Sequence, residues 1–296
     1  GTGIARYNTG TDGSVLVVGK QYLATLTISN YSGSGTLGVS GGAGFDTNFR
    51  YSANGTYTTY ITYDSEEVQL FYRSTNTATI GLTLQEVVID HSGNDKGLAV
   101  HGTITKESVA TGAELVSYGP FSTSNRLRQP YNSDLKFDTN DFYVMFWMNS
   151  NGIPDNHETL VSKDEREFSI DFLANTTYDR RFRIYAMNSS NTLQFFDSGN
   201  DPFLPNTWTH VCVNFTNGNT CSIYINGVLN RTGTWSGTGD YNIDSTSAGL
   251  NIGCRYEGGS YLHDADGTKL ALVRIGKNPP SPEKVREIYN DERDLY

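Results

Sequence analysis

The side chains best suited to hold a ligand gather in one stretch near the end of the chain, residues 255–267, RYEGGSYLHDADG. It supplies tyrosines, acidic and imidazole groups, and glycines that favour turns. Proteins bind sugars by stacking the sugar ring on an aromatic side chain and by hydrogen-bonding its hydroxyl groups. The stretch therefore predicts a glycan site, and we expect the loop from Trp235 to Tyr241 to lie near it. The predicted contacts are Tyr256, Tyr261, His263, Trp235 and Tyr241. The alternative is that Tyr256 and Tyr261 merely cover an edge of the fold.

Two carboxylates of the same stretch, Asp264 and Asp266, are candidate ligands for Ca²⁺. Calcium takes about six to eight oxygen ligands. The spacing is not that of an EF-hand, because Lys269 stands where the glycine is needed and Ile275 where the last glutamate is needed. Two interpretations stay open: a calcium loop of another kind, or an Asp-Gly turn that leads into a strand beginning at Lys269.

Other reactive arrangements are missing from the sequence. No G-x-S-x-G or C-x-x-C motif is present, and the histidines lack the short spacing of metal ligands: His91, His101, His157, His210 and His263. His210 alternates with Trp208 and Cys212, which is typical of a packed strand residue. The formal net charge of −10 argues against a nucleic-acid partner. No apolar run reaches the roughly 18 residues of a membrane-spanning helix, so membrane insertion is not expected.

The clearest structural signal is a β-hairpin at residues 208–227, WTHVCVNFTNGNTCSIYING. An odd-numbered loop at Asn217–Asn219 gives one continuous apolar face, whereas a slip of one residue would destroy it. We expect Asn219 to take the left-handed conformation in this loop. The facing residues are then Val211, Val213 and Phe215 on one strand and Ile225, Ile223 and Cys221 on the other. This register puts Cys212 and Cys221 on opposite faces, so it predicts no disulfide between them.

Composition points to an all-β fold: the chain of 296 residues has 31 glycines, 19 tyrosines and 14 phenylalanines. Short strands with turns between them predict two β-sandwiches of jelly-roll type. The expected domains are residues 1–90, a packed connector at 91–115, and residues 116–296. A short helix is predicted from Ser281 to Tyr289, with Ser281 as N-cap and Pro282 in the first turn.

Three motifs of the second domain together resemble a known superfamily. They are DFYVMFW at residues 141–147, the hairpin at 208–227, and the segment from 266 to 289 with DGTKLALVRI and SPEKVREIY. Their order and spacing are similar to those of concanavalin A-like lectins and glucanases, with the laminin-G-like and pentraxin-like branches nearest in pattern. The first domain, with GKQY at 19–22 and LTLQEVVI at 82–89, resembles a carbohydrate-binding-module-like jelly roll.

The whole order, including GTIT at 102–105 and ATGA at 110–113, resembles the distal part of marine bacteriophage tail fibre proteins. The resemblance implies a recognition module on the virion, outside the cell, that binds a host cell-surface glycan. It also implies contact with other virion chains, in a homotrimer for example. A purely structural virion protein is an alternative.

Because the superfamily includes glucanases, hydrolysis is a second alternative. Its glucanases carry an acidic strand, and the nearest candidate here is residues 165–171, EREFSID. On a strand Glu165, Glu167 and Asp171 would share a face, but Ser169 interrupts the series. Retaining hydrolysis needs two carboxyl groups about 5–5.5 Å apart. We therefore predict that the protein is not an enzyme.

Overall fold

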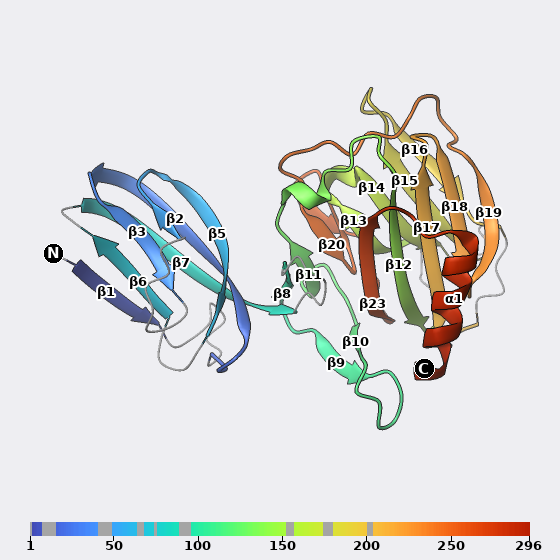
Figure 1. Cartoon of the computed structure of the whole chain (residues 1–296), viewed down its shortest axis with the longest axis horizontal. Coiled ribbons are helices and arrows are strands. Elements are labelled where there is room, and N and C mark those ends of the chain that lie inside the picture. The colour runs from blue at the N-terminus through green and yellow to red at the C-terminus, as the bar shows by residue number, and fades with distance from the viewer. Residues whose placement is uncertain are drawn as a thin grey trace. The chain divides into compact units, whose positions relative to one another are not determined.

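The computed structural model describes residues 2–7, 16–40, 49–63, 68–73, 76–88, 96–151, 157–173, 180–199 and 204–296. The chain divides into two compact units, residues 1–100 and 101–296, and both consist mainly of β-strands (Figure 1). The predicted all-β fold with one short C-terminal helix is confirmed. Among the described residues, no helix has the length and apolar character needed to cross a membrane.

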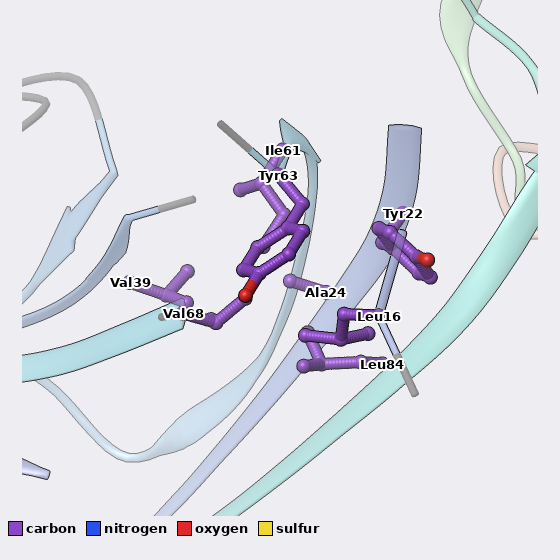
Figure 2. Close-up of a cluster of buried hydrophobic side chains, with 8 residues drawn as sticks. All are labelled: Leu16, Tyr22, Ala24, Val39, Ile61, Tyr63, Val68 and Leu84. Carbon is purple, nitrogen blue, oxygen red and sulfur yellow. The ribbon is translucent and has the colours of Figure 1, made fainter. Parts of the chain in front are cut away.

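Unit 1 contains two antiparallel sheets. One has the order β1-β6-β3-β4 and the other β5-β2-β7-β8. The strands are β1 (Thr2–Tyr7), β2 (Gln21–Gly33), β3 (Thr36–Ser40), β4 (Arg50–Tyr51), β5 (Gly55–Thr62), β6 (Val68–Arg73), β7 (Asn76–Val88) and β8 (Leu98–His101). Figure 2 shows the buried cluster to which strands of both sheets contribute, with Val39 and Val68 from one sheet and Ala24, Ile61 and Leu84 from the other.

Unit 2 is a sandwich of two sheets. The first has the order β19-β18-β17-β12-β23-β10-β9, and the second runs β16-β15-β14-β13-β20-β11. The first sheet comprises β9 (Thr105–Ser108), β10 (Val116–Gly119), β12 (Phe142–Ser150), β17 (Thr209–Thr216), β18 (Thr220–Ile225), β19 (Val228–Thr234) and β23 (Thr268–Lys277). The second comprises β11 (Arg126–Gln129), β13 (His157–Lys163), β14 (Phe168–Leu173), β15 (Arg181–Met187), β16 (Leu193–Asp197) and β20 (Leu250–Ile252). A separate hairpin is formed by β21 (Arg255–Glu257) and β22 (Ser260–Leu262).

Aromatic rings fill the space between the two sheets. Phe142 of β12 stacks on Phe215 of β17 at 4.1 Å between ring centres, and it meets Phe168 of β14 at 5.4 Å. All three side chains are fully buried. β12 lies between β17 and β23, as its sequence indicates. It is apolar on both faces because one face packs against the second sheet, whereas Met145 on the other face packs against Val285 of the C-terminal helix.

The register of the β17–β18 hairpin is the predicted one. Val211 pairs with Ile225, Val213 with Ile223, and Phe215 with Cys221. The loop conformation differs from the expectation, because Asn217 (φ 53°) and Gly218 (φ 69°) are the left-handed residues in place of Asn219. Asn217 is held in this conformation by Asp141, whose carboxylate accepts a hydrogen bond from its backbone N–H at 2.8 Å. The described cysteines are free and buried: Cys212, Cys221 and Cys254.

Helix α1 (Pro282–Glu292) covers the outer face of the first sheet (Figure 1). The Ser281 hydroxyl accepts a hydrogen bond from the Lys284 N–H and caps the helix, as predicted. Val285 is buried against Met145 and Cys212. Short 3-10 turns occur at η1 (Ser133–Leu135), η2 (Asp164–Arg166) and η3 (Arg293–Leu295).

Candidate functional site

The outer face of the second sheet of unit 2 is polar and rich in charge. Asp171 lies opposite Arg183, and Arg183 lies opposite Asp197, so the three side chains share one face. Arg183 donates hydrogen bonds of 2.6 and 2.8 Å to Asp197, and its guanidinium carbon lies 4.4 Å from the centre of the Phe195 ring. The alternate residues of β14 face the core: Phe168, Ile170 and Phe172. This face therefore carries ion pairs and aromatic rings on a rigid sheet.

The β21–β22 hairpin folds over this polar face and is tied to it by charged groups. Arg166 donates hydrogen bonds of 2.8 and 2.5 Å to Glu257. Arg255 forms an ion pair with Asp171 at 3.4 Å. Burial raises the pKa of Asp171 to about 6, and Arg255 opposes this effect. These pairs fix the hairpin to the sheet.

Turn η2 carries Arg166 into position. Glu165 (φ 56°) and Arg166 (φ 55°) are both left-handed, a conformation that costs a non-glycine residue about 1–2 kcal/mol. The Glu165 carboxylate accepts a hydrogen bond from the backbone N–H of Gly258 at 3.1 Å. Glu165 and Glu167 therefore do not lie on a strand with Asp171, because the strand begins at Phe168. Contacts with the hairpin offset the strain of the turn.

Tyr256 and Tyr261 lie opposite each other on this hairpin and are both half-buried. Their ring centres are 5.0 Å apart and the ring planes meet at 56°. The guanidinium carbon of Arg126 lies 3.4 Å from the centre of the Tyr261 ring, and that of Arg128 lies 5.7 Å from the Tyr256 ring. The two tyrosines thus form a pair at the surface, which we call the tyrosine pair, flanked by two arginines.

Arg128 is held by a buried polar network. It donates hydrogen bonds of 2.8 and 2.7 Å to the two carboxylate oxygens of Asp164 and one of 2.7 Å to Asn251. Asp164 also accepts hydrogen bonds of 2.8 Å from the Asn251 side chain and from the Gly249 N–H. Because Asp164 is satisfied on both oxygens, Arg128 has a fixed position beside Tyr256.

The end of the stretch turns back onto β13. The backbone carbonyl of His263 accepts a hydrogen bond from the Thr159 N–H at 2.7 Å, and its ring lies 5.4 Å from that of His157. Burial, together with the charges of His263 and nearby arginines, lowers the pKa of His157 to about 4. The imidazole of His157 is thus neutral at pH 7.

Asp264 is half-exposed and Asp266 is exposed, and both precede β23. Glu158 is buried and accepts a hydrogen bond from the Thr268 hydroxyl at 2.7 Å. Burial raises the pKa of Glu158 to about 7, and the charges of Asp266 and Asp264 add to the effect. Across the described ranges, no three His, Cys, Asp or Glu side chains are grouped to hold a metal ion. The described side chains do not form a calcium cage, and calcium binding stays a prediction.

The structure does not bring Trp235 and Tyr241 to the tyrosine pair. Both are buried in the core, where Trp235 lies 5.8 Å from Phe215 and Tyr241 lies 5.8 Å from Phe142 between ring centres. The Tyr241 hydroxyl donates a hydrogen bond to the carbonyl of Asn140 at 3.0 Å. Large aromatic rings gain more from core packing than from exposure at a loop, which corrects the expectation that these two contact a ligand.

A family model described as the concanavalin A-like lectin/glucanases superfamily matches residues 121–286, which is more than half of the chain. The chain belongs to this superfamily. No curated protein sequence matches it.

Several solved structures share the lectin-like fold. The binding domain of Paraclostridial mosquitocidal protein 1 has a TM-score of 0.53 at 14% identity, covering 69% of this chain and 49% of that chain. The botulinum neurotoxin serotype D ligand binding domain, in complex with N-acetylneuraminic acid, has a TM-score of 0.52 at 12% identity, covering 71% and 48%. The botulinum neurotoxin DC binding domain, in complex with rat synaptotagmin II, has a TM-score of 0.52 at 15% identity, covering 72% and 49%. This chain thus spans about half the length of each, and the likeness shows the fold.

The superfamily includes glucanases, but the three candidate catalytic acids of this chain, Glu165, Glu167 and Asp171, are each engaged in a structural contact. Glu165 caps the hairpin turn, and Glu167 accepts a hydrogen bond of 2.7 Å from the Ser245 N–H. Asp171 is fully buried and paired with Arg255. These acids do not lie together on one strand, as they do in a glucanase, because Glu165 and Glu167 precede strand β14. The solved structures named above are all binding domains.

The two arginines beside the tyrosine pair, Arg126 and Arg128, were not predicted from the sequence as site residues. Leu127 is 2% exposed, and Arg126 and Arg128 flank it on the other face of β11. This alternation in R-L-R is the signal of a strand with its arginines pointing away from the core. Nothing in it indicates that the arginines meet tyrosines from a hairpin much later in the chain.

Proposed function

We propose that residues 101–296 form a non-catalytic recognition module that binds a cell-surface glycan at the tyrosine pair. The proposal rests on one observation, the pairing of Tyr256 and Tyr261 on a hairpin anchored to a charged sheet face. Sugar sites combine an aromatic surface with a few fixed polar groups. Tyr256 and Tyr261 supply the surface, and His263 and the flanking arginines supply the polar groups.

Related binding domains support this choice of ligand class. The botulinum neurotoxin serotype D domain was solved in complex with N-acetylneuraminic acid, and the neurotoxin DC domain in complex with SialylT. The same DC domain was also solved in complex with rat synaptotagmin II, so a protein ligand is the competing class for this fold. We favour a glycan because the tyrosine pair is half-buried and flanked by fixed side chains, which suits a small ligand.

A glycan array on the full chain tests the proposal, followed by calorimetry with the sugars that bind. Tyr256→Ala and Tyr261→Ala are expected to weaken binding about tenfold each, since aromatic stacking contributes on the order of 1 kcal/mol or more. Tyr143→Ala is the matched control, because Tyr143 is also half-buried but lies on β12, on the side covered by α1. No binding on the array, or equal binding by all variants, would reject the proposal.

We further propose, from the motifs of the sequence, that the chain is the distal part of a bacteriophage tail fibre, exposed on the virion. Its partners would be the host glycan and other virion chains, in a homotrimer. A trimer in sedimentation that binds no sugar would favour the structural alternative, and release of reducing ends from a glucan would favour the hydrolase. Repeating the sugar titration with calcium and then with a chelator tests whether Asp264 and Asp266 bind the ion.

A further inference from the structure

Arg126 is the one arginine of the polar face without an acidic partner among the described residues. Each of the other arginines on this face forms an ion pair with a carboxylate: Arg128 with Asp164, Arg166 with Glu257, Arg181 and Arg183 with Asp197, and Arg255 with Asp171. A half-buried cation without a counter-charge loses hydration that an ion pair would otherwise offset. The position of Arg126 therefore needs another explanation.

The contacts of Arg126 fix its guanidinium in place and leave donors free. The group stacks 3.4 Å above the Tyr261 ring. Nη1 donates a hydrogen bond of 2.9 Å to the carbonyl of Thr123, and Nη2 lies 3.4 Å from Nδ1 of His101. Nε is buried without a hydrogen-bond partner among the described residues. Because each terminal nitrogen carries two hydrogens, one N–H remains on each of Nη1 and Nη2.

We propose that Arg126 makes the module selective for acidic saccharides, with a carboxylate or sulfate group accepting hydrogen bonds from its guanidinium while the sugar contacts the tyrosine pair. This inference rests on the proposed glycan-binding function and adds the class of sugar. A guanidinium with two free N–H groups matches the two oxygens of a carboxylate or sulfate. Stacking on Tyr261 orients it before the ligand arrives, which lowers the entropic cost of binding.

Because the whole chain is acidic, a preference for acidic saccharides must come from a positive group at the site itself. A formal net charge of −10 repels anions at long range. Screening confines that repulsion to about 8–10 Å in physiological salt, so at contact distance the guanidinium of Arg126 can attract an anion. Burial, together with the charges of Arg126 and Arg128, lowers the pKa of His101 to about 4, which is consistent with positive potential at this position.

Binding of matched oligosaccharides tests the inference on the full chain. The set comprises a neutral oligosaccharide, its counterpart with a uronic acid at one position, and its counterpart with one O-sulfate. The wild type is expected to bind at least one acidic member about tenfold tighter than the neutral one, as expected for a charge-assisted bidentate pair. Arg126→Gln removes this preference, because it weakens binding of the acidic members more than binding of the neutral one. Arg126→Lys keeps part of the preference for acidic members, because the positive charge remains but the bidentate guanidinium geometry is lost.

Arg231→Gln is the matched control. Arg231 also lies over an aromatic ring, 5.0 Å from Phe196, and also lacks an acidic partner among the described residues, but it is exposed on β19. Its variant keeps the acidic preference, and circular dichroism shows that all variants are folded. Equal binding of neutral and acidic members by the wild type, or an unchanged preference in Arg126→Gln, overturns the inference while the glycan function stands. Absence of binding to every sugar overturns both.

Discussion

His210 illustrates how tertiary contacts set the properties of a single residue. It is fully buried under α1, with its ring centre 5.2 Å from Trp147 and 6.0 Å from Tyr289. Neither ring nitrogen has a hydrogen-bond partner in the described part of the chain. Burial lowers the pKa of His210 to about 4 from 6.5; Arg274 adds to this effect and Glu292 opposes it. The imidazole is therefore neutral at pH 7 and acts as a packed aromatic ring.

His210→Phe is expected to reduce the loss of stability in acid. Between pH 6.5 and 4 the unfolded chain binds a proton at this position and the folded chain does not, so stability falls as the pH falls. Removing the group should make the difference in unfolding free energy between pH 8 and pH 5 smaller by about 2 kcal/mol. Urea denaturation at the two pH values measures it.

Tyr296→Phe is the control for this variant, because Tyr296 stacks on the same Trp147 ring, at 4.3 Å, and has no group that titrates in this range. It should leave the pH dependence unchanged. Glu158 and Asp171, with pKa values raised to about 7 and about 6, act in the opposite direction in every variant, so only the difference from the wild type is informative. An unchanged pH dependence in His210→Phe would show that the ring takes up its proton without cost.

At the scale of elements, the β21–β22 hairpin owes its position to side chains outside it. Arg166 from η2 and Asp171 from β14 bind its two charged residues, Glu257 and Arg255. The hairpin is short, and an isolated two-stranded hairpin is marginally stable in water. The conformation of the hairpin, and the position of the tyrosine pair on it, therefore depend on these ion pairs.

Glu257→Gln is expected to loosen the hairpin without unfolding the unit. The pair with Arg166 is partly exposed, with side chains 20% and 29% accessible, so its loss should cost about 1 kcal/mol of local stability. Hydrogen exchange of amides at 255–262 should then be about fivefold faster. Glu287→Gln, which removes the exposed pair with Lys284 on α1, should leave this exchange unchanged. Equal exchange rates in wild type and Glu257→Gln would mean that the ion pair does not hold the hairpin.

At the scale of the molecule, unit 2 contains everything that the proposed site requires. The two sheets, the helix and the hairpin all come from residues 101–296, and the aromatic core lies between these sheets. Domains with their own core usually fold alone.

Residues 101–296 expressed alone are therefore expected to fold and to bind the same glycans as the full chain. A single cooperative thermal transition and a near-ultraviolet circular dichroism signal from the packed rings would show a native core. A fragment without that signal, or with strong binding of a hydrophobic dye, would show that unit 2 depends on unit 1.

Local sequence patterns were sufficient to predict the all-β class, the β17–β18 register and the capped helix. These follow from local rules: a period of two fixes which residues of 211–225 face inward, and Ser281 and Pro282 mark a helix start whatever lies nearby. Motifs in the sequence also indicated the concanavalin A-like superfamily, and the family model confirms it.

Which aromatic residues are available to a ligand depends on long-range packing and could not be predicted from the sequence. Trp235 and Tyr241 have the same residue types as a sugar site but lie in the core, whereas Tyr256 and Tyr261 stay at the surface. The turn at Glu165 and Arg166 also overrode a strand-like pattern, because its left-handed backbone lets both side chains reach the hairpin. Burial and ion pairing depend on residues distant in the chain, so no local pattern could place Arg126 on Tyr261.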